Sequence, residues 1–319
     1  MMAPTMLFAL LVGLLSSAST TVTAQETDSD FTLKILFIND HHSHLTEETF
    51  PVYTSDLDTS TTANINTTNV TKVYVKYGGF PRLVTLFDAL ESASTSDATL
   101  KLHAGDVFSG TLFFSLFTGY ADMQLMSPMC FHAMGIGNHE FDLGNAPLEE
   151  FLYNLTEATT SQCEAPTKIL AANIVPPADT TLESLLLPYM IQEYDNDQKV
   201  AIIGLTTNLT KSMSSPNAGT TFNDEVTVLT ETVAALEAEG INKIIAMTHT
   251  GYDFDTAAIS TVAGVDAIVG SHSHSLLGDL EELGPLGIPK GSFPSMVNGV
   301  CIVQAWSNGH VSQIHLIVC

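Results

Sequence analysis

The chain has 319 residues, of which 45% are hydrophobic, so it can bury the core of one large domain or two smaller ones and is not a disordered protein. Its 35 acidic and 10 basic residues give a formal net charge of -25, and Arg82 is the only arginine. Because such a surface repels DNA, RNA and anionic lipid, we expect no nucleic-acid polymer as a partner.

The N-terminal segment has the composition of a secretory signal. Residues 1–24 contain no charged side chain, and the apolar run Met6–Leu15 is followed by small residues that end in Val22-Thr23-Ala24. We therefore expect cleavage after Ala24, although no Lys or Arg precedes the apolar run. Ten apolar residues are too few to span a bilayer, and no later stretch of the sequence is long and apolar enough to do so. The mature chain, residues 25–319, is predicted to be secreted.

Two further features agree with an oxidising, extracellular compartment. Asn-x-Ser/Thr sites, which are predicted to carry glycans, occur at Asn66, Asn69, Asn154 and Asn208. The four cysteines allow three disulfide connectivities, and we favour the pairs closest in sequence, Cys130 with Cys163 and Cys301 with Cys319. Their spacing matches no zinc-binding pattern, so a structural role is expected.

The first half of the chain alternates short apolar runs with segments of helical spacing. In order, it predicts a buried strand at Phe31–Ile38, a long exposed loop at Glu47–Val75, a helix at Tyr77–Leu90 and a strand at Leu100–Leu102. There follow a mostly apolar helix at Thr111–Met126, with Gly119 inside or ending it, a strand at Phe131–Ile136 and a helix at Pro147–Leu155.

Strands become more frequent in the second half. Strands are predicted at Lys168–Ile174 and Lys199–Leu205, a polar loop at Leu209–Asn223, and an amphipathic helix at Val226–Glu239 closed by Gly240. Next come a strand at Ile241–Thr248, a helix at Asp253–Ala263, a strand at Val265–Val269, and strands at Ser295–Ala305 and Val311–Val318 joined by a turn at Ser307–Gly309. This order, without an internal linker, predicts one α/β domain with layered sheets and outer helices.

Five predicted strands end in side chains that bind metal ions well. In chain order these are Asp40 with His42, Asp106, Asn138 with His139, His249, and His272 with His274. Any one of them could be an ordinary polar turn, as could the whole stretch Gly137–Asp142. Because open α/β sheets place their ligands at the carboxyl ends of the strands, five such ends together predict a metal site.

The types of these side chains indicate which metals would bind. A set of Asp, His and Asn ligands without Cys suits two divalent catalytic ions rather than a structural zinc, and we favour zinc over manganese, iron or cobalt. Asp40 and His42 point the same way if the backbone is extended, and His41 then points away. Asp106, placed by a turn at Gly105, can bridge two ions that activate a shared water.

The same residues give the chain a specific resemblance to the catalytic domain of the 5'-nucleotidase family, within the calcineurin-like metallophosphoesterases. The motifs that carry it are Asn39-Asp40-His41-His42, Gly105-Asp106, Gly137-Asn138-His139-Glu140-Phe141-Asp142, Thr248-His249-Thr250-Gly251 and Gly270-Ser271-His272-Ser273-His274, supported by Gly78–Arg82 and Val303–Ala305. The resemblance extends from about Phe31 to the end of the chain. It implies a four-layer α-β-β-α fold with two sheets between outer helices.

The resemblance also implies individual roles. A first metal ion would be held by Asp40, His42, Asp106 and His274, and a second by Asp106, Asn138, His249 and His272. His139 corresponds to a catalytic histidine that stabilises or protonates the leaving oxygen, and Asp142 to its carboxylate partner. Asn138 and His139 are also expected to contact the substrate phosphate. His44 stands where some family members have a substrate-contacting arginine, and it is either a substrate contact or an ordinary surface residue.

Other histidines carry weaker expectations. His103 lies near Asp106 in the sequence, so it either supports the site or packs in the core. His132, His310 and His315 fall in strand-like runs and are expected to be structural.

The functional expectation is a secreted two-metal phosphoesterase that hydrolyses nucleotides or related small phosphate esters through a hydroxide that bridges the two metals. Members of the family carry a C-terminal domain that binds the nucleotide base. We expect this domain to be absent here, so that either the substrate is small or another chain supplies the missing part. Two alternatives stay open: a catalytically impaired secreted binding protein that keeps the metal cage, and a truncated nucleotidase fragment.

Overall fold

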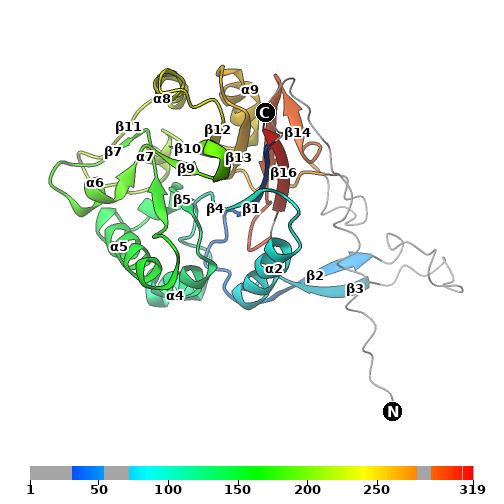
Figure 1. The fold of residues 1–319 in the computed structure, drawn as a ribbon. Helices are drawn as coiled ribbons and strands as arrows, with labels where there is room; N and C mark the ends of the chain where they lie inside the picture. Colours follow the sequence, from blue (N-terminus) through cyan, green and yellow to red (C-terminus); the bar gives the residue numbers. More distant parts are fainter. Residues whose placement is uncertain (1–30, 54–71, 279–288, 311, 319) are drawn as a thin grey trace, which may run out of the picture.

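The computed structural model describes residues 31–53, 72–278, 289–310 and 312–318 (Figure 1). Within these ranges the chain forms two six-stranded sheets. The first has the order β16 (Ser312–Val318), β1 (Phe31–Ile38), β4 (Ala98–His103), β5 (Ala133–Gly135), β6 (Lys168–Leu170) and β8 (Leu186–Leu187). The second has the order β14 (Ser295–Val297), β15 (Val300–Gln304), β13 (Ala267–Gly270), β12 (Ile244–His249), β10 (Lys199–Thr206) and β9 (Tyr189–Glu193).

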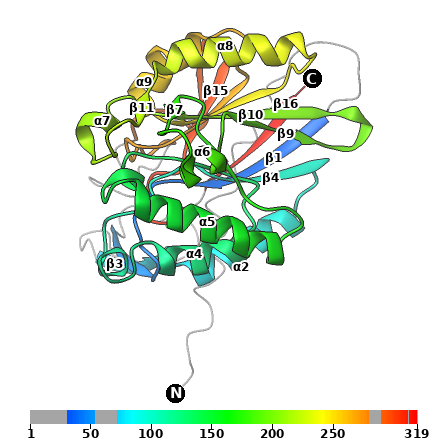
Figure 2. The same cartoon turned by 90° about the vertical axis from the view of Figure 1, so that its left-hand side faces the viewer.

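Helices cover the outer face of each sheet. The α-helices are α2 (Phe80–Ser92), α3 (Leu112–Phe117), α4 (Tyr120–Met126), α5 (Asn145–Gln162), α6 (Thr181–Leu185), α7 (Thr210–Met213), α8 (Glu225–Ala238) and α9 (Tyr252–Ala257). Figure 2 shows α2, α4 and α5 on the side of the first sheet and α8 on the side of the second. The predicted four-layer α-β-β-α fold is therefore confirmed.

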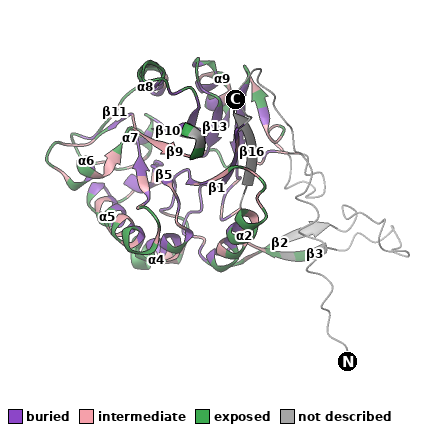
Figure 3. Ribbon diagram, in the orientation of Figure 1, coloured by how far each residue is buried: buried purple, intermediate pink, exposed green. Residues whose placement is uncertain are grey.

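Three buried clusters correspond to the three interfaces between these layers. Leu33, Ile35 and Phe37 of β1 face the second sheet, where they meet residues such as Ile202 and Met247. Leu36 and Ile38 point the other way, into the cluster beneath α2, α4 and α5. A third cluster lies between the second sheet and α8. Strand β1 is thus buried on both faces, which agrees with its mostly apolar sequence (Figure 3).

The central strands run parallel, so their carboxyl ends lie at one edge of each sheet. β4 pairs in parallel with β1 and with β5 in the first sheet. β12 pairs in parallel with β10 and with β13 in the second. This arrangement brings the loops after β1, β4, β5, β12 and β13 to the same part of the molecule.

The segment Glu47–Val75 was predicted to be one exposed loop, and this prediction is wrong at both ends. Glu48–Tyr53 forms β2 and Lys72–Tyr77 forms β3, and the two pair as an antiparallel hairpin. Their Val and Tyr residues favour strand structure more strongly than the polar neighbours oppose it. Residues 54–71, with Asn66 and Asn69, lie outside the described residues.

Two turns divide the segments predicted as a helix at Thr111–Met126, where Gly119 was expected inside or at the end of the helix, and as a strand at Ser295–Ala305. Thr118 and Gly119 have φ of 50° and 85°, and they separate α3 from α4. Asn298 and Gly299 have φ of 53° and 86° and form the turn between β14 and β15, a pair that favours tight hairpin turns. Some short elements were not predicted. β7 (Ile174–Val175) pairs with β11 (Thr221–Phe222), and both β11 and α7 lie within the predicted loop Leu209–Asn223.

The two final predicted strands do not lie next to each other. β15 belongs to the second sheet, whereas β16 pairs antiparallel with β1 in the first. The chain between them therefore crosses from one sheet to the other, and it carries two residues that bond to the start of the β1 loop: the Trp306 carbonyl accepts from Asn39 Nδ2 at 2.7 Å, and Asn308 N donates to the Asp40 carbonyl at 2.9 Å.

Several predictions concerning secretion can be compared with the structure. The signal at residues 1–24 lies outside the described residues. In the described part of the chain, no helix has both the length and the apolarity needed to cross a membrane. Asn154 on α5 is half-buried, and Asn208 is exposed with its side-chain nitrogen donating to Glu225 at 3.0 Å. Glycosylation of both stays a prediction.

One of the two predicted disulfides is present. Cys130 and Cys163 form a disulfide across a sequence separation of 33 residues, as predicted. Cys301 is a free, buried thiol on β15 between the two sheets, so its predicted pairing with Cys319 is wrong. Cys319 itself lies outside the described residues.

The disulfide generates a stability prediction. Replacing Cys130 and Cys163 with serine should lower the free energy of unfolding by about 2–4 kcal/mol, because the cross-link restricts the unfolded chain. Urea unfolding measures the change, with Cys301→Ala as a control that removes a thiol without opening a cross-link. A stability insensitive to the double substitution would contradict the prediction.

Candidate metal centre

Each predicted metal ligand lies at the end of a strand or in the loop that follows it. Five of the seven have a left-handed backbone: Asp40 (φ 49°), His42 (47°), Asp106 (57°), His272 (74°) and His274 (47°). Left-handed non-glycine residues are uncommon, and they gather where function requires an unusual geometry. The extended backbone assumed for Asp40 and His42 is therefore wrong, although both side chains do face the same centre.

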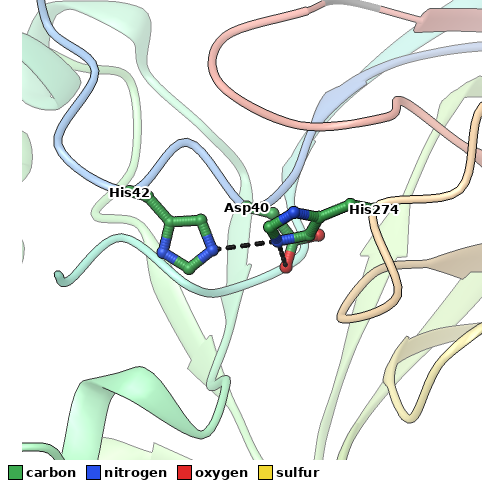
Figure 4. A group of neighbouring side chains, drawn as sticks. All are labelled: Asp40, His42 and His274. Atoms are coloured by element: carbon green, nitrogen blue, oxygen red, sulfur yellow. Dashed lines mark hydrogen bonds and ion pairs between the residues drawn. The ribbon is translucent and has the colours of Figure 1, made fainter. Parts of the chain in front are cut away.

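The first candidate group contains Asp40, His42 and His274 (Figure 4). His42 Nε2 lies 3.0 Å from His274 Nε2, and His274 Nε2 lies 3.5 Å from Asp40 Oδ1. His42 Nδ1 donates to the Phe108 carbonyl at 2.9 Å. This bond leaves the lone pair of a neutral His42 on Nε2, which faces the group.

The second candidate group contains Asp106, His249 and His272. His249 Nε2 lies 3.0 Å from Asp106 Oδ2, while His249 Nδ1 lies 3.1 Å from the Ala104 carbonyl. The two groups adjoin, because Asp106 Oδ2 is also 3.7 Å from His42 Nε2. The carboxylate of Asp106 thus faces both groups, the position that a bridging ligand requires.

One buried atom at this centre tests whether metal ions fit. Asn138 Oδ1 makes no hydrogen bond within the described residues. Unsatisfied buried polar atoms are rare because each loses its bonds to water without replacement. A divalent cation would satisfy this oxygen, and the Asp, His and Asn donors around it are ordinary ligands of such ions. The residues therefore fit a pair of divalent cations.

The environment keeps Asp106 available as a ligand. Burial by itself would raise the pKa of Asp106, but the neighbouring imidazoles of His249 and His42 hold it below its usual value. The carboxylate is therefore ionised at neutral pH. A side chain at Gly137 would collide with it, so glycine at that position permits the close approach of the two loops.

His139 and Asp142 form a pair at the rim of the first group. His139 Nδ1 lies 2.7 Å from Asp142 Oδ2, and this hydrogen bond raises the pKa of His139 to about 9. Asp142 also accepts from the hydroxyls of Ser109 and Ser214. The His139 side chain is 39% exposed, and its ring centroid lies 5.1 Å from that of His42. It is therefore placed beside the candidate ligands with its second nitrogen unused by Asp142.

The remaining histidines have other surroundings. His44 Nδ1 contacts Glu48, which also accepts from the Tyr77 hydroxyl at 2.8 Å, so a substrate contact by His44 stays a prediction. His132 Nδ1 accepts from Lys101 N at 3.0 Å. His310 stacks on Tyr77 and lies against Trp306. The side chain of His315 lies outside the described residues.

Glu140 holds the site together, although no pattern in the sequence predicts a role for it. Its fully buried carboxylate accepts from four backbone N–H groups: Gly137 at 2.6 Å, Asp106 at 2.9 Å, Val107 at 2.6 Å and Phe108 at 3.2 Å. Burial and the charge of Asp106 raise the pKa of Glu140 to about 7, whereas these donors favour its ionised form. Glu140 thereby ties the loop of Asp106 to the loop of Asn138.

Two amides hold the other ligand loops. Asn39 Nδ2 donates to Asp40 Oδ2 at 2.6 Å, and Asn39 Oδ1 accepts from Ala305 N at 2.7 Å. Gln304 accepts from Ser275 N and donates to the Ser271 carbonyl at 2.9 Å. Both amides stand inside sequence motifs that indicated the site, but the partners of an amide cannot be read from a motif.

Substitution of Glu140 should be severe. Glu140→Ala leaves four buried N–H groups without an acceptor, so we expect a loss of at least about 3 kcal/mol in the free energy of unfolding. Urea unfolding and metal content measure the effect, with Glu150→Ala as an exposed glutamate control. Stability and metal content equal to those of the control would show that the carboxylate does not join the two loops.

Comparisons with known proteins agree with this fold. Residues 33–276 match the family described as calcineurin-like phosphoesterase. The chain is 36% identical over 287 residues to a probable 5'-nucleotidase of Treponema pallidum, covering 88% of this chain and 44% of the relative. It is 33% identical over 284 residues to the 5'-nucleotidase of Homo sapiens, covering 87% of this chain and 45% of the relative.

Solved structures show the same likeness. The NAD nucleotidase of Haemophilus influenzae superimposes with a TM-score of 0.76 and 33% identity, over 90% of this chain and 53% of the other. A 5'-nucleotidase precursor of Thermus thermophilus gives 0.72 and 35%, over 89% and 51%. The chain spans about half the length of these relatives. The family match, together with the two ligand groups at the strand ends, shows that the chain belongs to the calcineurin-like phosphoesterase family.

Proposed function

We propose that this chain hydrolyses phosphate esters of nucleotides, or of related small molecules, with the help of two divalent cations. The observation that carries the proposal is that two ligand groups adjoin and that the carboxylate of Asp106 lies close to both. The His139–Asp142 pair lies beside them. Support for a nucleotide substrate comes from relatives named 5'-nucleotidase and NAD 5'-nucleotidase. The disulfide between Cys130 and Cys163 supports the predicted secretion, because disulfides persist in oxidising compartments.

The proposed ligand sets are those expected from the family resemblance. The first cation would be held by Asp40, His42, Asp106 and His274, and the second by Asp106, Asn138, His249 and His272. Zinc suits this mixture of nitrogen and oxygen donors, as do manganese, iron and cobalt. When bound, such a pair supplies Lewis acidity toward the phosphate oxygens and makes a nucleophile from water at neutral pH.

His139 is proposed to supply the proton. Because Nδ1 donates to Asp142, the protonated ring carries its second proton on Nε2, where it can donate to a phosphate oxygen or to the leaving oxygen. Asp142 keeps the ring in this orientation and is itself held by Ser109 and Ser214.

The charges of the chain support a phosphate held mainly by cations. Arg82 is the only arginine, and its Nη2 donates to Glu47 at 2.5 Å, so it does not offer a free bidentate clamp. Phosphate would then be held by the cations, Asn138 and His139. The presence of the His139–Asp142 pair disfavours the alternative of a binding protein without catalysis, because neither side chain is needed to hold a cation.

The direct experiment uses the purified chain and measures inorganic phosphate released from AMP and ADP, and the nucleoside monophosphates formed from NAD and from a nucleoside diphosphate sugar. We expect turnover of at least one substrate, its loss on chelation and its return with added Zn²⁺ or Mn²⁺, because the cations are required for the reaction. Protein that has bound metal but turns over no phosphoester on a broad panel would sink the proposal.

His139→Ala separates catalysis from metal binding. We expect kcat to fall by about 10²-fold or more, because a proton donor and charge stabiliser is lost, while the metal content stays at the wild-type level. His132→Asn, which alters a histidine outside both ligand groups, should leave kcat unchanged. Loss of metal from His139→Ala would show that this residue is a ligand.

A further inference from the structure

A second polar cluster lies behind the ligand loops, on the side away from the candidate metal centre. It consists of His41, Ser43, His103 and Asp122, all of which are fully buried. The surroundings are apolar: the ring of His41 meets Phe80 edge to face, and the ring of His103 meets Phe131 in the same way. Buried polar groups in such a place persist when they satisfy one another.

The contacts determine where the protons of both imidazoles lie. Gly105 N–H donates to His103 Nδ1 at 3.1 Å, so the proton of His103 is on Nε2. His103 Nε2 lies 2.8 Å from His41 Nδ1 and donates to it, which places the proton of His41 on its own Nε2. His41 Nε2 then donates to Asp122 Oδ1 at 3.0 Å, and Ser43 donates to Asp122 Oδ2 at 3.1 Å. The hydrogen bonds run in one direction, from the β4 loop to α4.

This chain is attached to the ligand loops at two points. His41 stands between Asp40 and His42, and Gly105 directly precedes Asp106. The two loops also run side by side, since Asp40 N donates to the Gly105 carbonyl at 2.9 Å and His42 N to the Asp106 carbonyl at 3.1 Å. The ring of His41 is bonded through both nitrogens, so its orientation is unique.

Attachment to this buried chain of hydrogen bonds can stabilise the backbone of the ligand loops. Asp40, His42 and Asp106 all have left-handed backbones, which cost free energy and persist only when the surroundings hold them. Asp122, on α4, gives the chain of hydrogen bonds a fixed end outside the loops. Loss of any member would leave a buried donor or acceptor unpaired and free the loops to relax.

We propose that Asp122, His41 and His103 are positioning residues that hold Asp40, His42 and Asp106 in the geometry needed for binding metal ions. The inference rests on the proposed function in one respect, namely that these three side chains are metal ligands. It predicts that the groups behind the loops control metal affinity although they do not face the metal centre.

The test is the Zn²⁺ affinity of the purified chain, measured by competition with a chelator, together with the visible spectrum of the Co²⁺-loaded protein. Asp122→Leu and His103→Phe should each weaken Zn²⁺ binding by about 10-fold, as supporting partners of metal ligands do, and change the Co²⁺ spectrum. The double variant should bind no more weakly than either single variant, because both substitutions release the same ring, that of His41.

Two further variants separate positioning from stability. Asp122→Asn keeps an acceptor for His41 Nε2–H and should bind Zn²⁺ nearly as the wild type does. Thr159→Val, on α5, removes a buried hydroxyl that donates to the Leu155 carbonyl and accepts from Thr167 N, so it should lower stability without changing Zn²⁺ affinity. If Asp122→Leu does not fold, the contrast between His103→Phe and Asp122→Asn carries the test.

Wild-type affinity in His103→Phe and Asp122→Leu would overturn the inference, as would effects that add in full in the double variant. A wild-type chain that binds no Zn²⁺ and no Co²⁺ would instead refute the proposed function, and the inference with it. These measurements report metal binding and need no turnover, so failure of the positioning inference can be distinguished from failure of the proposed function.

Discussion

The carboxylate of Glu140 is the contact on which the rest of the candidate centre depends. Four backbone N–H groups from two loops converge on its two oxygens, and the side chain is fully buried. The loop of Asp106 is thereby fixed relative to the loop of Asn138. His139 N adds a bond to Asp106 Oδ1 at 3.0 Å, so the proposed catalytic residue is placed by the same junction. Ligand geometry here is set by hydrogen bonds between buried side chains and the backbone of the ligand loops.

Because the chain is strongly acidic, the proposed cations would also be needed to attract an anionic substrate. A formal net charge of -25 repels an anionic substrate, and the candidate centre adds the carboxylates of Asp40 and Asp106. Bound divalent cations are often the largest local charges in a site, and here they would reverse its sign. Phosphate recognition and metal binding would therefore be one property of this chain, since Arg82 is already paired with Glu47.

Much of the fold and of the site could be predicted from short-range patterns. The strand Phe31–Ile38 is buried on both faces and has a mostly apolar sequence, and the histidines and carboxylates stand where such strands end. The features that could not be predicted depend on contacts between residues that are far apart in the sequence. Asp122 lies 81 positions from His41, and the partners of Glu140 lie up to 34 positions away. Nothing near Cys301 in the sequence indicates that β15 and β16 join different sheets. Asn298-Gly299, by contrast, is a local hairpin signal, and it marks the turn between β14 and β15.

The most direct measurement of the central claim is anomalous X-ray scattering from crystals of the chain grown with Zn²⁺. The account predicts two zinc peaks that share Asp106, one among Asp40, His42 and His274 and the other among Asn138, His249 and His272. A single peak, or zinc bound only at surface carboxylates, would contradict the claim that these strand ends form a two-metal centre.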